Sequence, residues 1–101
     1  MATPLIVPRA DSEGGLGSAT KYWASAYIDT ITTTGNIILP DDAKIIFGTG
    51  GDGQIFSGGL NLTIANVTQD ADILFKGNDN GTTITALTLD MSLAGAATFG
   101  G

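Results

Sequence analysis

The amino-acid sequence predicts an all-β fold, a meander of very short strands, and three observations support this. Short runs of β-branched and aromatic residues recur along the chain, as expected for strands. Glycine, asparagine and aspartate, which favour tight turns, separate these runs. Only one segment is a candidate for a helix, and it is short. The elements follow in chain order.

The first 17 residues predict an extended arm. Prolines and glycines interrupt this stretch, and Leu5-Ile6-Val7 is its one apolar run. Proline restricts both itself and the residue before it, which makes a helix here unfavourable. We expect this arm to become ordered only by lying on another surface.

Ser18–Ile28 is the helix candidate, with one or two turns expected. Ser18 can cap it, and Trp23 and Tyr27 are four residues apart and share a face. Together with Tyr22 they make three of the chain's seven aromatic residues. Two interpretations remain: a stacking platform for a sugar or a nucleic-acid base, or a local plug that joins the arm to the rest of the chain.

The remaining elements are short strands separated by turn signals. A two-glycine turn at Gly58-Gly59 and a turn over 77–81 separate two pairs of them. In the last strand, Leu87 and Leu89 face one way and continue into Met91 and Leu93. The tail from Ala94 has small residues around Phe99 and is assigned no element. The predicted strands are Tyr27–Thr33, Ile37–Leu39, Ile45–Phe47, Ile55–Phe56, Leu60–Ile64, Ile73–Phe75 and Thr82–Asp90.

Charge and hydropathy limit the possible partners. The chain has four basic and ten acidic residues, which gives a net charge of -6. A negative surface repels nucleic acid and anionic lipid, so both are excluded as partners. Charged residues make up only 14% of the chain, and the mean hydropathy is +0.25. This is too few charges for the surface of a typical monomer. Several predicted strands are also apolar on both faces, so we expect identical chains to wrap around a shared axis.

The residue types and motifs of the chain argue against a catalytic or metal site and against a membrane-spanning segment. Cysteine and histidine are absent. The start of the chain has no signal-peptide pattern, and no run approaches the ~18 apolar residues of a membrane span. Gly48–Gly53 matches G-x-G-x-x-G, but a strand-like sequence follows it where a dinucleotide site needs a helix. The acidic turns lack the spacing of a calcium loop. We expect no catalytic, cofactor or metal site.

Two segments resemble the fibre and appendage proteins of tailed phages. The first runs from Pro8-Arg9 through Leu16-Gly17 and Lys21-Tyr22-Trp23 to Tyr27-Ile28, ahead of threonine- and glycine-rich strands. The second is Ala86-Leu87-Thr88-Leu89-Asp90-Met91-Ser92 with Ala94-Gly95-Ala96-Ala97-Thr98-Phe99, which is similar to a repeat ending in long phage structural proteins. The two segments lie near the two ends of residues 4–99.

The resemblance implies an intertwined homotrimeric fibre, of β-prism or triple β-helix type, on the surface of a virion. Residues 1–26 would form the attachment arm with its helical junction, and residues 27–101 the stalk. The arm would dock on a capsid or tail protein through Leu5, Ile6, Val7, Arg9 and Leu16. The junction and trimer core would contain Trp23, Tyr27, Ile28, Leu87, Leu89 and Phe99.

The expected function is therefore a non-enzymatic tail or head fibre involved in host attachment. The chain would be either the first piece of a longer fibre or a short appendage. Contact with a host glycan would then come from a distal part outside this sequence. A capsid decoration protein and a carbohydrate-binding module are the alternatives.

Overall fold

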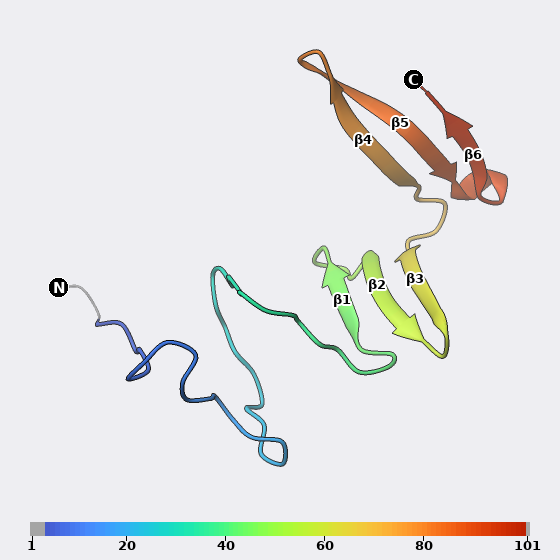
Figure 1. The fold of residues 1–101 in the computed structure, drawn as a ribbon. Coiled ribbons are helices and arrows are strands. Elements are labelled where there is room, and N and C mark those ends of the chain that lie inside the picture. The colour runs from blue at the N-terminus through green and yellow to red at the C-terminus, as the bar shows by residue number, and fades with distance from the viewer. Residues whose placement is uncertain (1–3, 101) are drawn as a thin grey trace. The chain divides into compact units, whose positions relative to one another are not determined.

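The computed structural model describes residues 4–100, so residues 1–3 of the predicted arm and Gly101 of the predicted stalk lie outside the described residues. The described chain is all-β, as the sequence predicts. Its six strands form two three-stranded antiparallel sheets, and there is almost no helix (Figure 1). The chain divides into two units between Gly35 and Asn36, and both sheets belong to the second unit.

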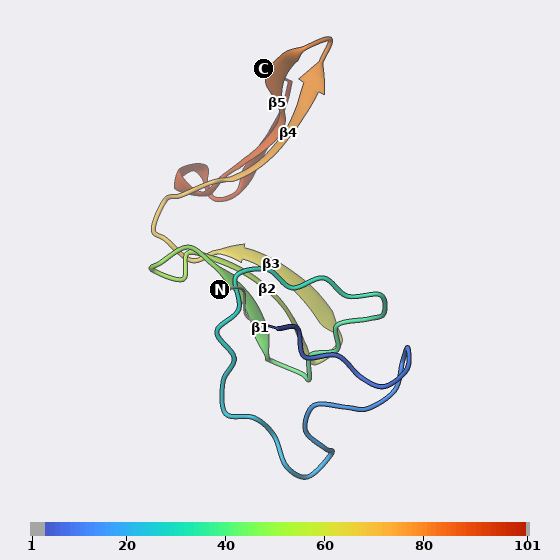
Figure 2. The same cartoon turned by 90° about the vertical axis from the view of Figure 1, so that its left-hand side faces the viewer.

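Residues 4–35 form neither strand nor helix, and the ribbon there has no arrow or coil (Figure 2). The predicted helix over Ser18–Ile28 is therefore wrong. Gly17 has a φ of 83°, and after it Ser18 and Lys21 exchange two backbone hydrogen bonds of 2.9 and 3.4 Å, which close a tight turn. A helix of one or two turns gains too few hydrogen bonds to offset the free-energy cost of nucleation, so the local turn is the more stable structure here.

The predicted strands Tyr27–Thr33 and Ile37–Leu39 are also absent from the structure. Among the described residues, none between 22 and 39 makes a backbone–backbone hydrogen bond. A strand is defined by its pairing, and the alternating sequence alone supplies no partner. These segments thus have the sequence of strands without the ladder of hydrogen bonds.

The first sheet confirms the predicted strand–loop–strand–turn–strand order over residues 43–64. The turn lies one residue later than predicted, at Gly59 and Leu60, so Gly58 ends the middle strand. Gly59 has a φ of 60°, the positive value that a type II′ hairpin turn needs at its first central position. The strands lie in the order β1-β2-β3: β1 Lys44–Phe47, β2 Gly53–Gly58 and β3 Asn61–Asn66.

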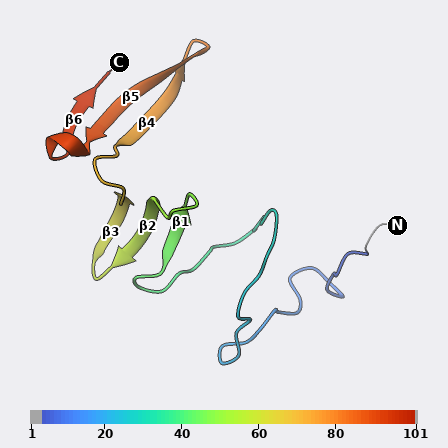
Figure 3. The same cartoon turned by 180° about the vertical axis from the view of Figure 1, so that it is seen from behind.

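The second sheet has the order β4-β5-β6, seen from behind in Figure 3. Its strands are β4 Ile73–Asp79, β5 Thr82–Asp90 and β6 Ala96–Phe99. β5 has the predicted bounds, β4 is longer than predicted, and β6 was not expected. Asn80 and Gly81 have φ values of 52° and 93°, the two positive values of a type I′ turn.

A 3₁₀ helix, Met91–Leu93, reverses the chain between β5 and β6. The Asp90 carboxylate accepts hydrogen bonds from the Ser92 backbone N–H at 3.1 Å and from its hydroxyl at 2.7 Å, and so caps this helix. Ala94 then adopts a left-handed conformation with a φ of 57°. The expectation that Met91 and Leu93 continue the apolar face of β5 is therefore wrong, because the strand ends at Asp90.

The segment between β3 and β4 is tied to both sheets by aspartates. The Asp52 carbonyl accepts from the Val67 N–H at 2.8 Å, and the Asp52 carboxylate accepts from the Thr68 hydroxyl at 2.5 Å. The Asp72 carboxylate accepts from the Met91 N–H at 3.1 Å. The segment that leads from one sheet to the next is thus held by side chains and not only by its own turns.

No side chain among residues 4–100 is buried. The sheets are formed and hydrogen-bonded, but the single chain provides no second layer that would cover them.

Candidate assembly surfaces

The first sheet presents one apolar face. The register places Ile45, Ile55 and Ile64 directly opposite one another across all three strands. Phe47 and Leu62 share this face, because side chains alternate along a strand, and Leu62 is 71% exposed. The result is an isoleucine row with flanking apolar groups that nothing in the described chain covers.

The opposite face of this sheet is mixed. Lys44 lies opposite Phe56, and its ammonium group is 4.7 Å from the centre of the Phe56 ring. Gln54 and Thr63 share this face, and so does the exposed Ile46, which lies opposite Gln54. The lysine and two polar side chains make this face less apolar than the isoleucine face, so the isoleucine face is the stronger candidate for covering by a partner.

The second sheet also has one apolar face, built from two rows across its strands. Phe75, Leu87 and Phe99 form one row, and Ile73, Leu89 and Ala97 form the other. Leu87 and Leu89 are half-buried, whereas Phe99 is 79% exposed. The structure thus brings together three of the predicted core residues: Leu87, Leu89 and Phe99.

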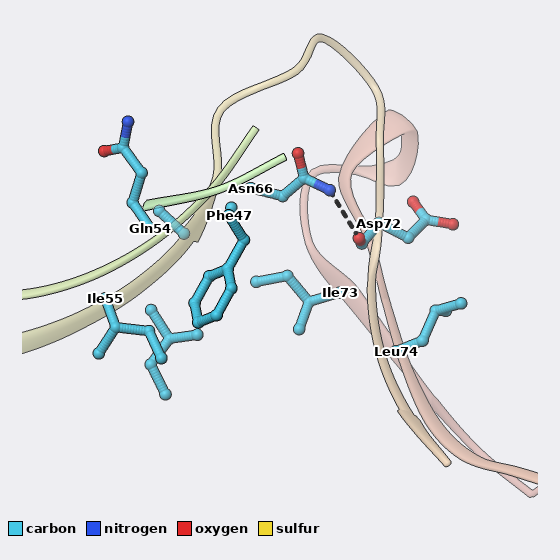
Figure 4. Close-up of a pocket in the computed structure, with 10 residues that line it drawn as sticks. Phe47, Gln54, Ile55, Asn66, Asp72, Ile73 and Leu74 are labelled. Carbon is cyan, nitrogen blue, oxygen red and sulfur yellow. Dashed lines mark hydrogen bonds between the residues drawn. The ribbon is translucent and has the colours of Figure 1, made fainter. Parts of the chain in front are cut away.

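A hollow of about 260 Å³ lies where the second unit passes from β3 to β4. Phe47 and Ile55 of the first sheet and Ile73 of the second line it, as Figure 4 shows. The Asn66 side-chain N–H donates to the Asp72 carbonyl at 3.0 Å at its border. Its lining is mainly apolar and includes Ile55 and Ile64 of the isoleucine row, and Asp72 is its one ionisable residue.

The predicted docking residues lie in the first unit and are exposed. Ile6, Val7 and Leu16 line one open hollow of about 550 Å³. Leu5 is exposed outside it, and Arg9 pairs with Glu13 through Nε and Oε1 at 2.8 Å. Three apolar side chains around one hollow are suited to receive an apolar partner.

Of the three clustered aromatics, the structure brings two together. Tyr22 and Trp23 line a shallow depression of about 250 Å³ with Gly17 and Lys21, and they are 82% and 68% exposed. The Tyr22 hydroxyl donates to the Ala19 carbonyl at 2.9 Å. Tyr27 lies outside the depression and is almost fully exposed, as is much of Ile28.

The glycine-rich loop after β1 leads into β2, which is a strand and not the helix that a dinucleotide site needs. Within residues 4–100, no group of three or more acidic, cysteine or histidine side chains is placed to hold a metal ion. No helix among these residues is long and apolar enough to cross a membrane.

In comparisons with known proteins, no family model, curated protein or solved structure matches this chain.

The isoleucine face was not predicted from the sequence. Neither was the position of Ile73, Phe75 and Ala97 beside the predicted core residues. The signal was present in part, because Ile45 and Phe47 alternate, as do Ile73 and Phe75. Which strands stand opposite one another depends on register, and Ala97 enters the face only because β6 pairs with β5.

Proposed function

We propose that the chain is a non-enzymatic structural protein of a phage virion, a trimeric fibre part that takes part in host attachment. The observation that carries this proposal is the pair of apolar sheet faces that the single chain leaves uncovered. Such faces mark sites of association in soluble proteins. The low charge content and the resemblance of two segments to phage fibre proteins give the assembly its proposed context.

In this proposal, the isoleucine face and the Phe75–Leu87–Phe99 face form the trimer core. Three copies around one axis cover the apolar faces and leave the acidic turns in water. Fully burying an isoleucine, leucine or phenylalanine side chain is worth about 1.5–3 kcal/mol. Two such faces per chain offer a driving force large enough to offset the entropy lost on association.

The first unit serves as the attachment arm. Ile6, Val7 and Leu16 around their open hollow bind an apolar element of a capsid or tail protein, with Leu5 beside them and the Arg9–Glu13 pair at the rim. Trp23, Tyr27 and Ile28 form the junction with the stalk.

The test is the mass of the assembled protein, measured by sedimentation equilibrium and native mass spectrometry at micromolar concentration. We expect three times the chain mass of 10.2 kDa. A folded monomer at this concentration contradicts the proposal. Imaging of virions that carry the chain then decides its place: a long projection supports a fibre, and a low knob on the capsomers supports decoration.

A carbohydrate-binding module is the second candidate, because Tyr22 and Trp23 line a shared, exposed depression. Exposed aromatic rings are the stacking surfaces that sugars use. Glycan binding that Trp23→Ala abolishes, with the mass unchanged, favours this function. Tyr27→Ala is the control, since Tyr27 is an aromatic residue that is even more exposed than Trp23 but lies outside the depression.

A further inference from the structure

The segment Tyr27–Thr33 has the sequence of a strand but no partner. Tyr27, Asp29, Ile31 and Thr33 alternate with Ile28, Thr30 and Thr32. None of these seven residues makes a backbone–backbone hydrogen bond within the described chain, and Ile31 is 69% exposed. An extended segment with unpaired N–H and C=O groups pairs readily with an open sheet edge.

Three of the four sheet edges have features that discourage pairing. β1 has four residues and begins with Lys44. β4 carries Lys76 and Asp79, and its register with β5 shifts after Phe75. β6 has four residues. Short strands, edge charges and register irregularities all protect an edge from addition.

The outer edge of β3 lacks these protections. β3 has six residues, Asn61–Asn66, with no charge and no proline. Outside its pairing with β2, it makes no backbone–backbone hydrogen bond in the described chain. Leu62 and Ile64 lie exposed on its apolar side. The edge is therefore an open template of about the same length as the unpaired segment.

We infer that Tyr27–Thr33 of one chain adds to the outer edge of β3 in a second copy, antiparallel, with Ile31 opposite Ile64. This register extends the row Ile45–Ile55–Ile64 by a fourth isoleucine. It also sets Thr32 beside Thr63. The parallel arrangement that keeps Ile31 at Ile64 sets the Asp29 carboxylate beside the apolar Leu62 and is disfavoured.

The same register places Asp29 opposite Asn66, whose side-chain amide already donates to the Asp72 carbonyl. The carboxylate therefore lies at the polar end of β3. The occupant is a second copy because the two apolar sheet faces already call for other copies, and each of these carries the same unpaired segment. The inference rests on the proposed assembly of several copies and specifies which strand is exchanged between them.

The experiment uses the absence of cysteine from the native sequence. Two full-length chains with different tags are coexpressed, one carrying Thr32→Cys and the other Thr63→Cys, and oxidised. A second pairing uses Ile31→Cys with Ile64→Cys, because opposed positions alternate between near and far separations and only the near ones suit a disulfide. Thr30→Cys with Thr63→Cys, two residues out of register, is the control.

We expect a disulfide between differently tagged chains in one of the two matched pairings and loss of that product in the control. Ile31→Pro abolishes the product in the matched Thr32–Thr63 pairing, because proline removes an N–H from the added strand. Thr34→Pro leaves it intact, since it lies just outside the segment and keeps Thr33 extended.

The outcomes separate the two proposals. A trimeric mass without an interchain disulfide in either matched pairing overturns strand addition and leaves the trimer standing. A disulfide within one chain, found when both cysteines are on the same polypeptide and absent between tagged chains, also overturns it. A monomeric mass overturns the proposed function and the exchange together.

Discussion

At the scale of single residues, the acidic side chains stabilise turns and connections. Asp52 holds the segment after β3, Asp90 caps the 3₁₀ helix, and the Asp72 carboxylate binds the Met91 N–H. Asp, Asn and Ser favour such local bonds with the backbone, which explains why these residues gather in loops.

Asp72→Ala should lower the free energy of unfolding by about 1–2 kcal/mol, because the Met91 N–H loses a charged acceptor in a partly buried place. Urea unfolding followed by circular dichroism measures the change. Asp79→Ala is the control and should shift stability by less than about 0.5 kcal/mol, since the described chain gives its carboxylate no hydrogen bond. Equal effects of both substitutions would show that Asp72 acts only through its charge.

Two glycines of the β4–β5 hairpin allow the effect of backbone strain on stability to be measured apart from that of steric crowding. A methyl group at Gly77 or at Gly81 meets no atom within 4 Å, but Gly81 alone has a positive φ, of 93°. Gly81→Ala should therefore destabilise the protein by about 1–2 kcal/mol. Gly77→Ala should stabilise it by about 0.4–1 kcal/mol through the unfolded state. Thermal unfolding of the two variants gives the comparison, and a stabilising Gly81→Ala contradicts the type I′ turn.

At the scale of elements, each sheet is held together by backbone hydrogen bonds between its three strands and has one apolar face. The row Phe75–Leu87–Phe99 comes from three different strands, so it exists only when β5 pairs on both sides. Thr88 is the next residue along β5 and points to the other face, between Leu74 and Thr98. Substitutions at the neighbouring positions Leu87 and Thr88 therefore test the two faces of the sheet separately.

Leu87→Lys should reduce the assembled protein to monomers or prevent its assembly, because a charge at the centre of the apolar row cannot be covered without a large desolvation cost. Thr88→Lys should leave the assembled mass unchanged. Sedimentation velocity distinguishes the two, and assembly that tolerates Leu87→Lys but not Thr88→Lys would place the core on the opposite face.

Most strands of the second unit were predictable from an apolar run bounded by turn residues, but Ile37–Leu39, which is bounded in the same way, forms no strand. β5 was predicted with its observed bounds, and β1 to within one residue. β6 was missed because Ala96 and Ala97 have weak strand propensity, and its pairing with β5 stabilises it. Ser18–Ile28 was wrongly predicted as helix because capping and spacing do not reveal the competing turn between Ser18 and Lys21.

At the scale of the whole molecule, the described chain has secondary structure without an interior. No side chain in residues 4–100 is buried, whereas small domains that fold alone bury most of the surface that their unfolded chains expose. The stability of the sheets should therefore come largely from association.

The thermal midpoint of unfolding should rise with protein concentration, because association binds the folded state and not the unfolded one. Scanning calorimetry over a hundredfold range of concentration measures this dependence. A midpoint that stays constant over that range, with a monomer present throughout, would mean that the sheets are stable without partners.

The sequence by itself determined the all-β class, most strands of the second unit and the turn residues between them, because these depend on local propensity and on the φ values that glycine and asparagine accept. It also indicated that the surface has too few charges for a typical monomer. Only the tertiary structure decided which residues stand opposite one another. Register and strand order bring Ile45, Ile55 and Ile64 into one row and Phe75, Leu87 and Phe99 into another, and these are contacts between residues distant in the chain. The same long-range pairing left Tyr27–Thr33 without a partner, which its alternating pattern alone could not reveal.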